Sequence, residues 1–380
     1  MRVALYHPWI YLTSGIERSF VELLARSRHE WLLLTHHHEA DATYPELREA
    51  QIVELSPPVS VHRSLAPLAR AAWRIGRSRL PLDGAQALLV SSEGLGDLVA
   101  PRSPVPVAAY CHTPLKILHD PATRAALVGT SAVKRAGLGV LGAGFEAVDR
   151  RAWRSYRHVF ANSEETRQRI ARAGLVPSGP VEVLHPGVDL ARFPRGDGRR
   201  EDFVLVAGRI MWQKDVELAL QTMEALQRKG RRTRLVVAGA VDEKSRAYLA
   251  DLRSRATGLD VAFEVDPTDA RLSELYRSCA LLLFTARNED FGIVPLEAMA
   301  SGAPVLAVDS GGPRETVVHG STGWLEPRDP ERFAERVLEV LDAPDNAVAM
   351  REAAVARAAG FTWNAFVQRI DDVMEDVAGG

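Results

Sequence analysis

Residues 281–300 read LLLFTARNEDFGIVPLEAMA, a short apolar run followed by a loop and a second apolar segment. The run at 281–284 lacks polar alternation, which is typical of a parallel strand covered on both faces. We expect a helix to begin near Ile293, because Gly292 gives a flexible entry and Pro295 is tolerated in a first turn. A strand, a loop and a helix in this order form the repeating unit of doubly wound α/β domains.

The same unit recurs along the chain. Buried strands are predicted in the first half at 3–6, 31–35, 52–55, 87–91, 105–110 and 159–161, and in the second half at 203–207, 235–238, 261–265, 281–284 and 305–308. Helical patterns separate them, for example at 216–227 and 270–278. This alternation predicts two Rossmann-like doubly wound domains, expected to face each other across a cleft.

A chain of 380 residues suits two domains. The segment 185–200 is rich in proline, glycine and charge, which is typical of a linker. We therefore predict an N-terminal domain at 1–190 and a C-terminal domain at 191–362. The last helix, 363–380, is expected to be capped by Thr362 and to pack back on the first domain.

The composition is that of a globular protein, with 46% hydrophobic and 25% charged residues and a net charge of −2. Up to residue 180 there are 22 Lys+Arg against 16 Asp+Glu, and afterwards 25 against 33. This difference fits either chance or an anionic partner for the first half. Two cysteines, no signal-peptide pattern and no apolar stretch of about 20 residues predict a cytoplasmic protein.

Two carboxylates flank the predicted start of the helix after 281–284. Glu289 lies in the loop and Glu297 lies about one turn into the helix. Free amide groups at a helix start form an anion site, and carboxylates beside it can accept hydrogen bonds from sugar hydroxyls. The alternative is a helix with an acidic N-terminus and no ligand.

Two further loops follow predicted strands of the second half. Gly208 and Arg209 end one strand, and Lys214 follows five residues later, which suits a diphosphate. Residues 309–315 read DSGGPRE after another strand. The alternative for Arg209 and Lys214 is a pair of solvated cations without a ligand. The alternative for the two glycines at 311–312 is a tight turn.

Taken together, Gly208-Arg209 with Lys214, Glu289-x7-Glu297 and the SGGPxE motif at 310–315 resemble glycosyltransferase family 4. The resemblance is dense over 200–325 and thinner in the first half. It implies the two-domain GT-B fold and transfer with retention at the anomeric carbon. It also implies that Glu289 binds the donor hexose, Glu297 the ribose, and Arg209 and Lys214 the diphosphate. Gly208 and the backbone of four further residues would complete the donor site: Phe291, Gly292, Ile293 and Val294.

The first half carries a glycine loop at 13–18. Family members usually have two glycines before the glutamate, whereas this chain has Ser14 and Gly15 before Glu17. We expect Gly15 to contact the donor, and Ser14 and Glu17 to lie on the acceptor side. A capping box formed by Ser14 and Glu17 is an equally good interpretation.

His112 ends another predicted strand, in Tyr110-Cys111-His112-Thr113-Pro114. A lone histidine is more often structural, but in the family a histidine at this position touches the donor sugar. We therefore place His112 with Arg209, Lys214 and Glu289 in the catalytic group. Asp120 is a weaker acceptor-side candidate.

Three other patterns in the sequence carry less information about function. Residues 137–142, GLGVLG, match a dinucleotide fingerprint by letters but follow no clear strand. Three consecutive histidines at 36–38 point in different directions from a strand end and do not suggest a metal site. Residues 62–79 hold five arginines and no acid along an amphipathic pattern, which fits either an anionic membrane surface or a helix packed on the core.

The expected reaction moves a hexose from a nucleotide diphosphate sugar to a hydroxyl, without a metal or other cofactor. The resemblance is strongest to mannosyltransferases, which favours GDP-mannose and a lipid-linked glycan acceptor, with peripheral membrane contact and no nucleic acid. The alternatives are a UDP-hexose or UDP-N-acetylhexosamine donor with a natural-product acceptor. A sugar-nucleotide epimerase of similar fold and a catalytically silent nucleotide-binding protein are the other classes.

Overall fold

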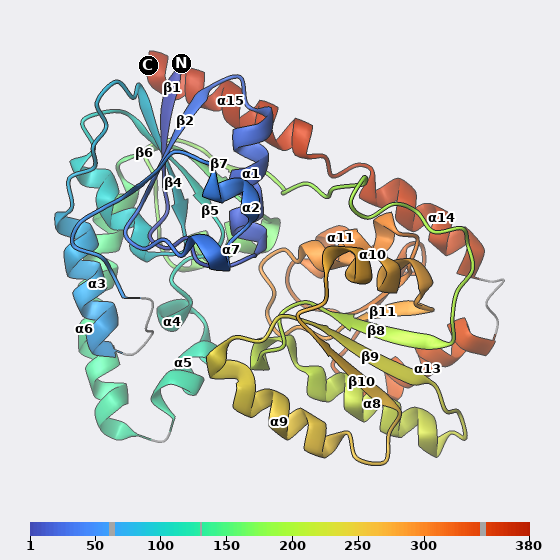
Figure 1. Cartoon of the computed structure of the whole chain (residues 1–380). Coiled ribbons are helices and arrows are strands. Elements are labelled where there is room, and N and C mark those ends of the chain that lie inside the picture. The colour runs from blue at the N-terminus through green and yellow to red at the C-terminus, as the bar shows by residue number, and fades with distance from the viewer. Residues whose placement is uncertain (61–64, 130, 343–346) are drawn as a thin grey trace. The chain divides into compact units, whose positions relative to one another are not determined.

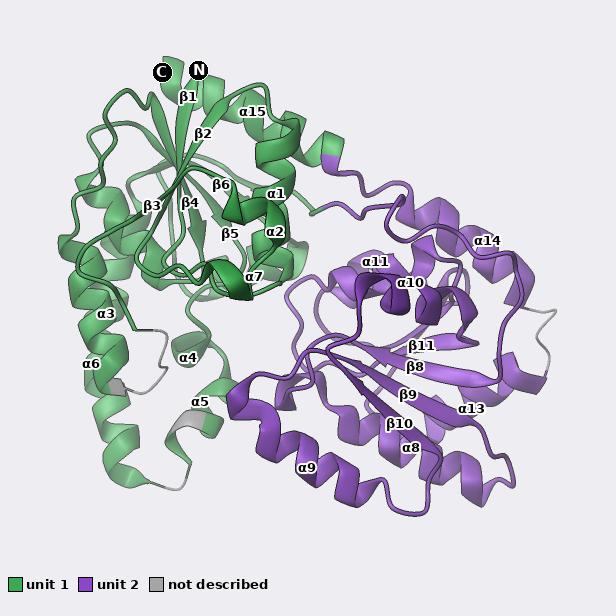
Figure 2. Cartoon of the chain, viewed as in Figure 1, with its two compact units in different colours: residues 1–186, 364–380 green, residues 187–363 purple. Residues whose placement is uncertain are grey.

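The computed structural model describes residues 1–60, 65–129, 131–342 and 347–380. The chain divides into two compact units, one formed by Met1–Pro186 with Asn364–Gly380 and the other by Gly187–Trp363 (Figure 2). Each unit contains a parallel sheet with helices between successive strands. The predicted α/β class, with two Rossmann-like doubly wound domains, is confirmed.

The first unit is built on seven parallel strands in the order β3-β2-β1-β4-β5-β6-β7. The strands are β1 Arg2–Tyr6, β2 Glu30–Thr35, β3 Ile52–Glu54, β4 Ala87–Ser92, β5 Val107–Cys111, β6 Tyr156–Ala161 and β7 Val181–Val183. The helices are α1 Gly15–Arg26, η1 Ala40–Ala42, α2 Pro45–Arg48, α3 Leu65–Arg77, η2 Leu95–Arg102, α4 Lys116–His119, α5 Pro121–Val128, α6 Ala132–Trp153, α7 Glu164–Arg172 and α15 Trp363–Gly379.

Helices cover both faces of this sheet, which explains the continuous apolar runs of its strands. Ala4 and Tyr6 of β1 share a hydrophobic cluster with Ile75 of α3 and Trp153 of α6. On the opposite face, the ring of Tyr110 packs edge-on against Phe366 of α15. Figure 1 shows α3 and α6 on one side of the sheet and α1 and α15 on the other.

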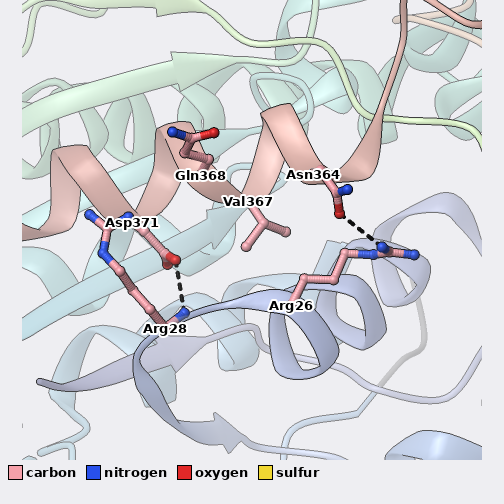
Figure 3. Close-up of a pocket in the computed structure, with 6 residues that line it drawn as sticks. All are labelled: Arg26, Arg28, Asn364, Val367, Gln368 and Asp371. Atoms are coloured by element: carbon pink, nitrogen blue, oxygen red, sulfur yellow. Dashed lines mark hydrogen bonds between the residues drawn. The ribbon is translucent and has the colours of Figure 1, made fainter.

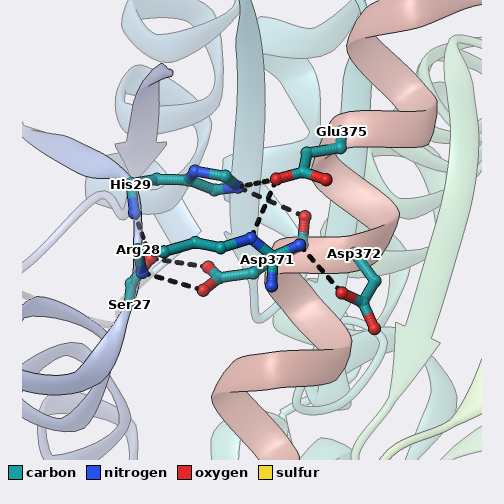
Figure 4. A network of polar contacts seen from close by, with 6 residues as sticks. All are labelled: Ser27, Arg28, His29, Asp371, Asp372 and Glu375. Atoms are coloured by element: carbon teal, nitrogen blue, oxygen red, sulfur yellow. Dashed lines mark hydrogen bonds and ion pairs between the residues drawn. The ribbon is translucent and has the colours of Figure 1, made fainter.

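The C-terminal helix α15 is attached to the first unit by charged side chains. The Asp371 carboxylate accepts hydrogen bonds from the Ser27 hydroxyl at 2.6 Å and from the Arg28 amide at 3.0 Å (Figure 4). The Arg28 guanidinium donates to Asp372 and Glu375, both at 2.8 Å. The end of the chain is therefore integrated with the turn between α1 and β2.

The second unit is built on six parallel strands in the order β10-β9-β8-β11-β12-β13. The strands are β8 Phe203–Ala207, β9 Arg234–Gly239, β10 Val261–Val265, β11 Leu281–Phe284, β12 Val305–Val308 and β13 Gly323–Glu326. The helices are η3 Trp212–Lys214, α8 Val216–Arg228, η4 Glu243–Ser245, α9 Arg246–Arg255, α10 Asp269–Ser278, α11 Ile293–Ala300, α12 Pro313–Thr316, α13 Pro330–Asp342 and α14 Ala347–Ala358.

Alternate residues of these strands enter two separate cores. Leu205 and Phe284 pack with residues of α10, α11 and α14. Their neighbours Val204 and Leu283 pack with residues of α8 and α13 on the other face. The strands β8, β11 and β12 are therefore apolar at every position, as the sequence pattern indicates.

Sequence patterns missed two strands, β7 and β13, and placed β5 about two residues early. Both missed strands lie at sheet edges. Val181–Val183 is half-buried throughout, and the Trp324 and Leu325 side chains of β13 are also half-buried. An edge strand in these surroundings does not produce the long apolar run that marks a central strand.

Candidate functional site

The two middle strands of the second sheet, β8 and β11, are hydrogen-bonded neighbours. The chain leaves β8 toward β9 on one side and leaves β11 toward β12 on the other. Ligands of doubly wound sheets bind beyond the carboxyl ends of the strands at such a point. The predicted residues Gly208, Arg209 and Lys214 follow β8, and Glu289 follows β11.

Lys214 and Glu289 are in direct contact at this edge. Lys214 Nζ lies 2.7 Å from Glu289 Oε2, with side-chain exposures of 18% and 23%. The ammonium group also lies 5.6 Å from the centre of the Phe284 ring. The Thr285 hydroxyl donates to the Lys214 carbonyl oxygen at 2.7 Å, which fixes the backbone of the lysine to the loop after β11.

Gly208 and Arg209 occupy the turn after β8. Gly208 has φ +114°, a conformation open to glycine, and a Cβ there would lie 3.7 Å from Val294 Cγ2. The turn therefore lies beside the first turn of α11. Arg209 is exposed, and within the described part of the chain its side chain has no hydrogen bond or ion pair.

The loop after β11 enters α11 at Gly292, which has φ +81°. A Cβ on Gly292 would lie 3.1 Å from Phe284 Cζ and 3.2 Å from Glu289 Cγ. The cap position of this helix is a glycine, which has no side chain to cap it, and the amides of a first helical turn are groups that can bind an anion. Phe291 is buried, while Ile293 and Val294 are half-buried around the helix start.

The glycines of the predicted loop at 309–315 are packed directly on this segment. The Gly312 amide donates to the Glu289 carbonyl oxygen at 3.0 Å. A Cβ on Gly311 would overlap with the Glu289 carbonyl oxygen, and a Cβ on Gly312 would overlap with the Phe291 backbone. Their role in the structure is thus to support the loop that carries Glu289.

Glu297 is held by a residue that the sequence did not reveal. The Tyr276 hydroxyl of α10 donates to Glu297 Oε2 at 2.9 Å. Burial, together with the nearby Glu297 charge, raises the pKa of Tyr276 well above its usual value, so it stays a donor. Tyr276 resembles any apolar position of an amphipathic helix, and only the fold shows where its hydroxyl points.

His112 lies at the carboxyl edge of the first sheet, directly after β5. Its Nε2 is 2.9 Å from the Ser91 hydroxyl of β4, and His7 Nδ1 is 2.9 Å from the Ser91 carbonyl oxygen. Burial lowers the pKa of His112 to about 3, with Glu93 opposing and His7 reinforcing this shift. The imidazole is therefore neutral at physiological pH and acts through hydrogen bonding. His7 was missed because a histidine before a proline has no distinctive signal.

The other first-half candidates occupy helix starts. The Ser14 hydroxyl accepts from the Ile16 amide at 3.2 Å and donates to the Glu17 carboxylate, which is buried. Gly15 is exposed, and a Cβ there would meet nothing within 4 Å. Asp120 caps α5 by accepting from the Thr123 amide at 2.8 Å. All these carboxylates and hydroxyls have local structural partners, whatever else they do.

A surface pocket of the first unit lies elsewhere, between the end of α1 and the helix α15 (Figure 3). Its polar groups are engaged with one another, since Arg26 donates to Asn364 at 2.8 Å and the Arg28 amide donates to Asp371. This pocket therefore belongs to the docking of α15. It contains none of the predicted site residues.

The described residues contain no group of three His, Cys, Asp or Glu side chains arranged to hold a metal ion. Of the histidines at 36–38, His36 is buried between the Tyr6 hydroxyl at 2.9 Å and the Ser78 hydroxyl at 2.8 Å. None of the helices in the described ranges is long and apolar enough to span a bilayer.

Two family models match the chain. The model described as "Glycosyl transferases group 1" matches residues 189–357, and "Glycosyltransferase Family 4" matches residues 14–192. Together they include every predicted site residue.

Curated relatives agree with these matches. The chain is 31% identical to D-inositol 3-phosphate glycosyltransferase 2 of Catenulispora acidiphila, over 73% of this chain and 67% of that protein. It is 30% identical to the alpha-1,3/1,6-mannosyltransferase alg-2 of Neurospora crassa, over 53% of this chain and 51% of that protein. The chain spans about half the length of several of the curated relatives that it matches.

Solved structures match at the level of the fold. Anabaena Alr3699/HepE in complex with UDP and glucose has a TM-score of 0.71 at 18% identity, covering 99% of this chain and 100% of that one. Sucrose-phosphate synthase from Thermosynechococcus elongatus has a TM-score of 0.74 at 18% identity, covering 99% of both chains.

Proposed function

Because this chain belongs to the group 1 and family 4 glycosyltransferases, we propose that it transfers a hexose from a nucleotide diphosphate sugar to a hydroxyl acceptor, with retention at the anomeric carbon. One observation carries the proposal. The loop after β8 brings Lys214 within 2.7 Å of Glu289, beside the start of α11 at the switch point of the second sheet. A cation, a carboxylate and a helix N-terminus in one place match the parts of a sugar diphosphate.

Each part of the donor has a proposed partner. Arg209 and Lys214 take the diphosphate together with the first amides of α11, and Glu297 takes the ribose. Glu289 takes hexose hydroxyls, and neutral His112 offers a further hydrogen bond to the hexose. As the bond to the diphosphate breaks, the cations and the helix dipole stabilise the charge that develops on the leaving group.

We propose that no metal takes part, because the diphosphate charge has these partners in the protein. The family resemblance implies that the acceptor attacks from the same face as the leaving phosphate, which takes up the acceptor proton. Closure around the donor would exclude water and limit hydrolysis. Activity that survives EDTA is the expected result, and activity restored only by a divalent cation would contradict it.

GDP-mannose is the proposed donor. The support is the identity of 30% to the mannosyltransferase alg-2 and the family resemblance of residues 110–114 and 289–295. A UDP-hexose or UDP-N-acetylhexosamine donor is the alternative. Several relatives are named D-inositol 3-phosphate glycosyltransferases. These names do not specify mannose, and this supports the alternative donors.

The proposed acceptor is a lipid-linked glycan reached at the membrane surface. On α3, the Trp73 side chain is 65% exposed, the Arg77 guanidinium lies over its ring at 5.2 Å from the ring centre, and Arg70 is also exposed. The predicted Arg63 lies outside the described residues. An exposed tryptophan among arginines suits an anionic lipid surface. Co-sedimentation with phosphatidylglycerol vesicles should fall for Trp73→Ala, and equal binding of both proteins would contradict this contact.

The central experiment is a calorimetric titration with GDP, UDP, GDP-mannose and UDP-N-acetylglucosamine in EDTA. Arg209→Ala should weaken nucleotide binding, whereas Arg232→Ala should not. Arg232 is a suitable control because it is exposed in the loop before β9, at the amino edge of the same sheet. GDP binding supports the mannosyl donor, UDP binding alone changes the donor, and no nucleotide binding refutes the proposal. If NMR shows that the protein converts one sugar nucleotide into another in the absence of an acceptor, the epimerase alternative is correct.

A further inference from the structure

Asp215 has an unusual position directly after Lys214. It adopts a left-handed backbone with φ 48° and ψ 48°, which is uncommon outside glycine and asparagine, and its side chain is fully buried. It occupies the cap position of α8, yet its side chain does not cap that helix. The turn itself is closed by backbone groups, since the Asp215 amide donates to Trp212 and the Leu218 amide donates to the Asp215 carbonyl.

The carboxylate of Asp215 is used instead to bind two arginines. Arg287 donates to Oδ1 at 2.8 Å. Arg328 donates its Nε to Oδ2 at 2.5 Å and a terminal nitrogen to Oδ1 at 2.9 Å. Burial opposes ionisation of Asp215, but the hydrogen bonds and charges of Arg328 and Arg287 lower its pKa, so the carboxylate remains charged.

These three residues come from three different segments at the carboxyl edge of the second sheet. Asp215 follows the loop after β8, Arg287 lies in the loop after β11 two residues before Glu289, and Arg328 lies between β13 and α13. A backbone hydrogen bond also connects the loops after β8 and β11, in which the Arg287 amide donates to the Gln213 carbonyl oxygen at 2.8 Å. The two loops that carry Lys214 and Glu289 are therefore joined immediately beside both residues.

We propose that Asp215 is a positioning residue for the donor diphosphate, which fixes Lys214 and Glu289 relative to each other by clamping Arg287 and Arg328. This rests on the proposed function. The buried carboxylate is not needed to form the turn, which would suit glycine or asparagine equally well. A buried charge is costly unless it is fully paired. The buried Asp215 carboxylate is paired by three hydrogen bonds from two arginines, and these bonds connect the loops that carry Lys214 and Glu289.

Removing Asp215 has two opposing effects on an anionic ligand. Loss of a negative charge strengthens the positive field of the arginines, whereas release of the loops misplaces Lys214. We expect the second effect to be larger, because a misplacement of about 1 Å can cost about a hundredfold in catalytic rate and misaligned groups also bind more weakly, while charge effects over longer distances are screened by salt.

The test compares a nucleoside diphosphate with its nucleoside. GDP and UDP are titrated by calorimetry, and guanosine and uridine by ligand-detected NMR, with wild type, Asp215→Gly and Asp215→Asn. Both substitutions tolerate the left-handed backbone. Asp215→Gly should bind the diphosphate about tenfold or more weakly with little change for the nucleoside. Asp215→Asn keeps one acceptor oxygen for Arg328 and should be intermediate.

Asp202→Asn is the matched control. Its carboxylate binds the Thr233 hydroxyl at 2.6 Å and Arg231 at 2.9 Å, but it lies before β8 at the amino edge of the sheet. It should leave both affinities unchanged. If Asp215→Gly does not fold, Arg328→Gln tests the same joint and should show the same selective loss for the diphosphate.

The outcomes separate this proposal from the proposed function. Wild type that binds no nucleotide would refute both. Wild type that binds the diphosphate, with a folded Asp215 variant that binds it equally or more tightly, would refute only the positioning role. A parallel loss of diphosphate and nucleoside binding would mean that Asp215 and Arg328 stabilise the unit without positioning Lys214.

Discussion

Replacing Glu289 with glutamine should strengthen the binding of a nucleoside diphosphate while it impairs transfer. Lys214 already has a partner within the protein, because its Nζ lies 2.7 Å from Glu289 Oε2. A phosphate group that recruits Lys214 must first draw it away from this carboxylate. Glu289→Gln keeps the size of the side chain and removes the competing charge.

The size of the gain follows from the geometry of the pair. Two unit charges 2.7 Å apart attract each other by about 1.5 kcal/mol at the dielectric constant of water. Because both side chains are only about one-fifth exposed, water screens the pair less than this, but desolvation and side-chain entropy oppose the attraction, and we take a net value of about 1 kcal/mol. Since about 1.4 kcal/mol corresponds to a tenfold change, GDP or UDP should bind the variant about fivefold more tightly.

The assay is calorimetry at two salt concentrations, with the transfer rate measured on the same preparations. The gain should shrink in about 1 M salt, where surface charges are screened. Asp202→Asn removes a carboxylate paired with Arg231 at the opposite edge of the sheet and should show no gain. A folded Glu289→Gln protein that binds the diphosphate no more tightly than wild type would show that Glu289 and phosphate do not compete for Lys214.

Two further predictions concern the support of the site and the core of the first unit. Gly312→Ala places a methyl group into the Phe291 backbone and should lower both nucleotide affinity and melting temperature. Gly139→Ala on α6 is the control and should lower neither, because a Cβ there meets nothing within 4 Å. Normal nucleotide affinity in Gly312→Ala would contradict the packing argument. Burial raises the pKa of Asp97 to about 6 although Tyr156 donates to it, so its contribution to stability should be lost as pH rises from about 4 to about 6. Asp97→Asn should flatten urea-unfolding free energies across this range by on the order of 2 kcal/mol, and parallel pH profiles would refute the assignment.

Much of the fold could be predicted because central parallel strands need apolar side chains on both faces. This requirement marks β8 and β11 clearly, and their loops then carry the chemistry. The edge strand β13 escapes detection because only part of it is buried. The letters GLGVLG at 137–142 match a fingerprint without its structural context, as the absence of a preceding strand indicates, since they lie within the helix α6.

For a similar reason, some candidate site residues can be recognised from the sequence and others cannot. Glu289 and Glu297 stand out because they match the order and spacing of a family pattern together with Gly208, Arg209 and the SGGPxE motif at 310–315. Asp215 and Arg328 are 113 positions apart, and each looks like an ordinary surface charge. Only the strand order brings them together, so a single sequence cannot reveal the joint.

The Lys214–Glu289 pair also has a consequence for selectivity under the proposed function. A nucleoside diphosphate that takes Lys214 leaves the Glu289 carboxylate without its cation. A nucleotide sugar can return hydrogen bonds to that carboxylate from its hexose hydroxyls, whereas the product diphosphate cannot. The ion pair should therefore disfavour the product more than the donor, and its re-formation after transfer should help the nucleoside diphosphate to leave. The contact that competes with the product for Lys214 thus supports turnover, and for this reason the glutamine variant should bind the product well and turn over slowly.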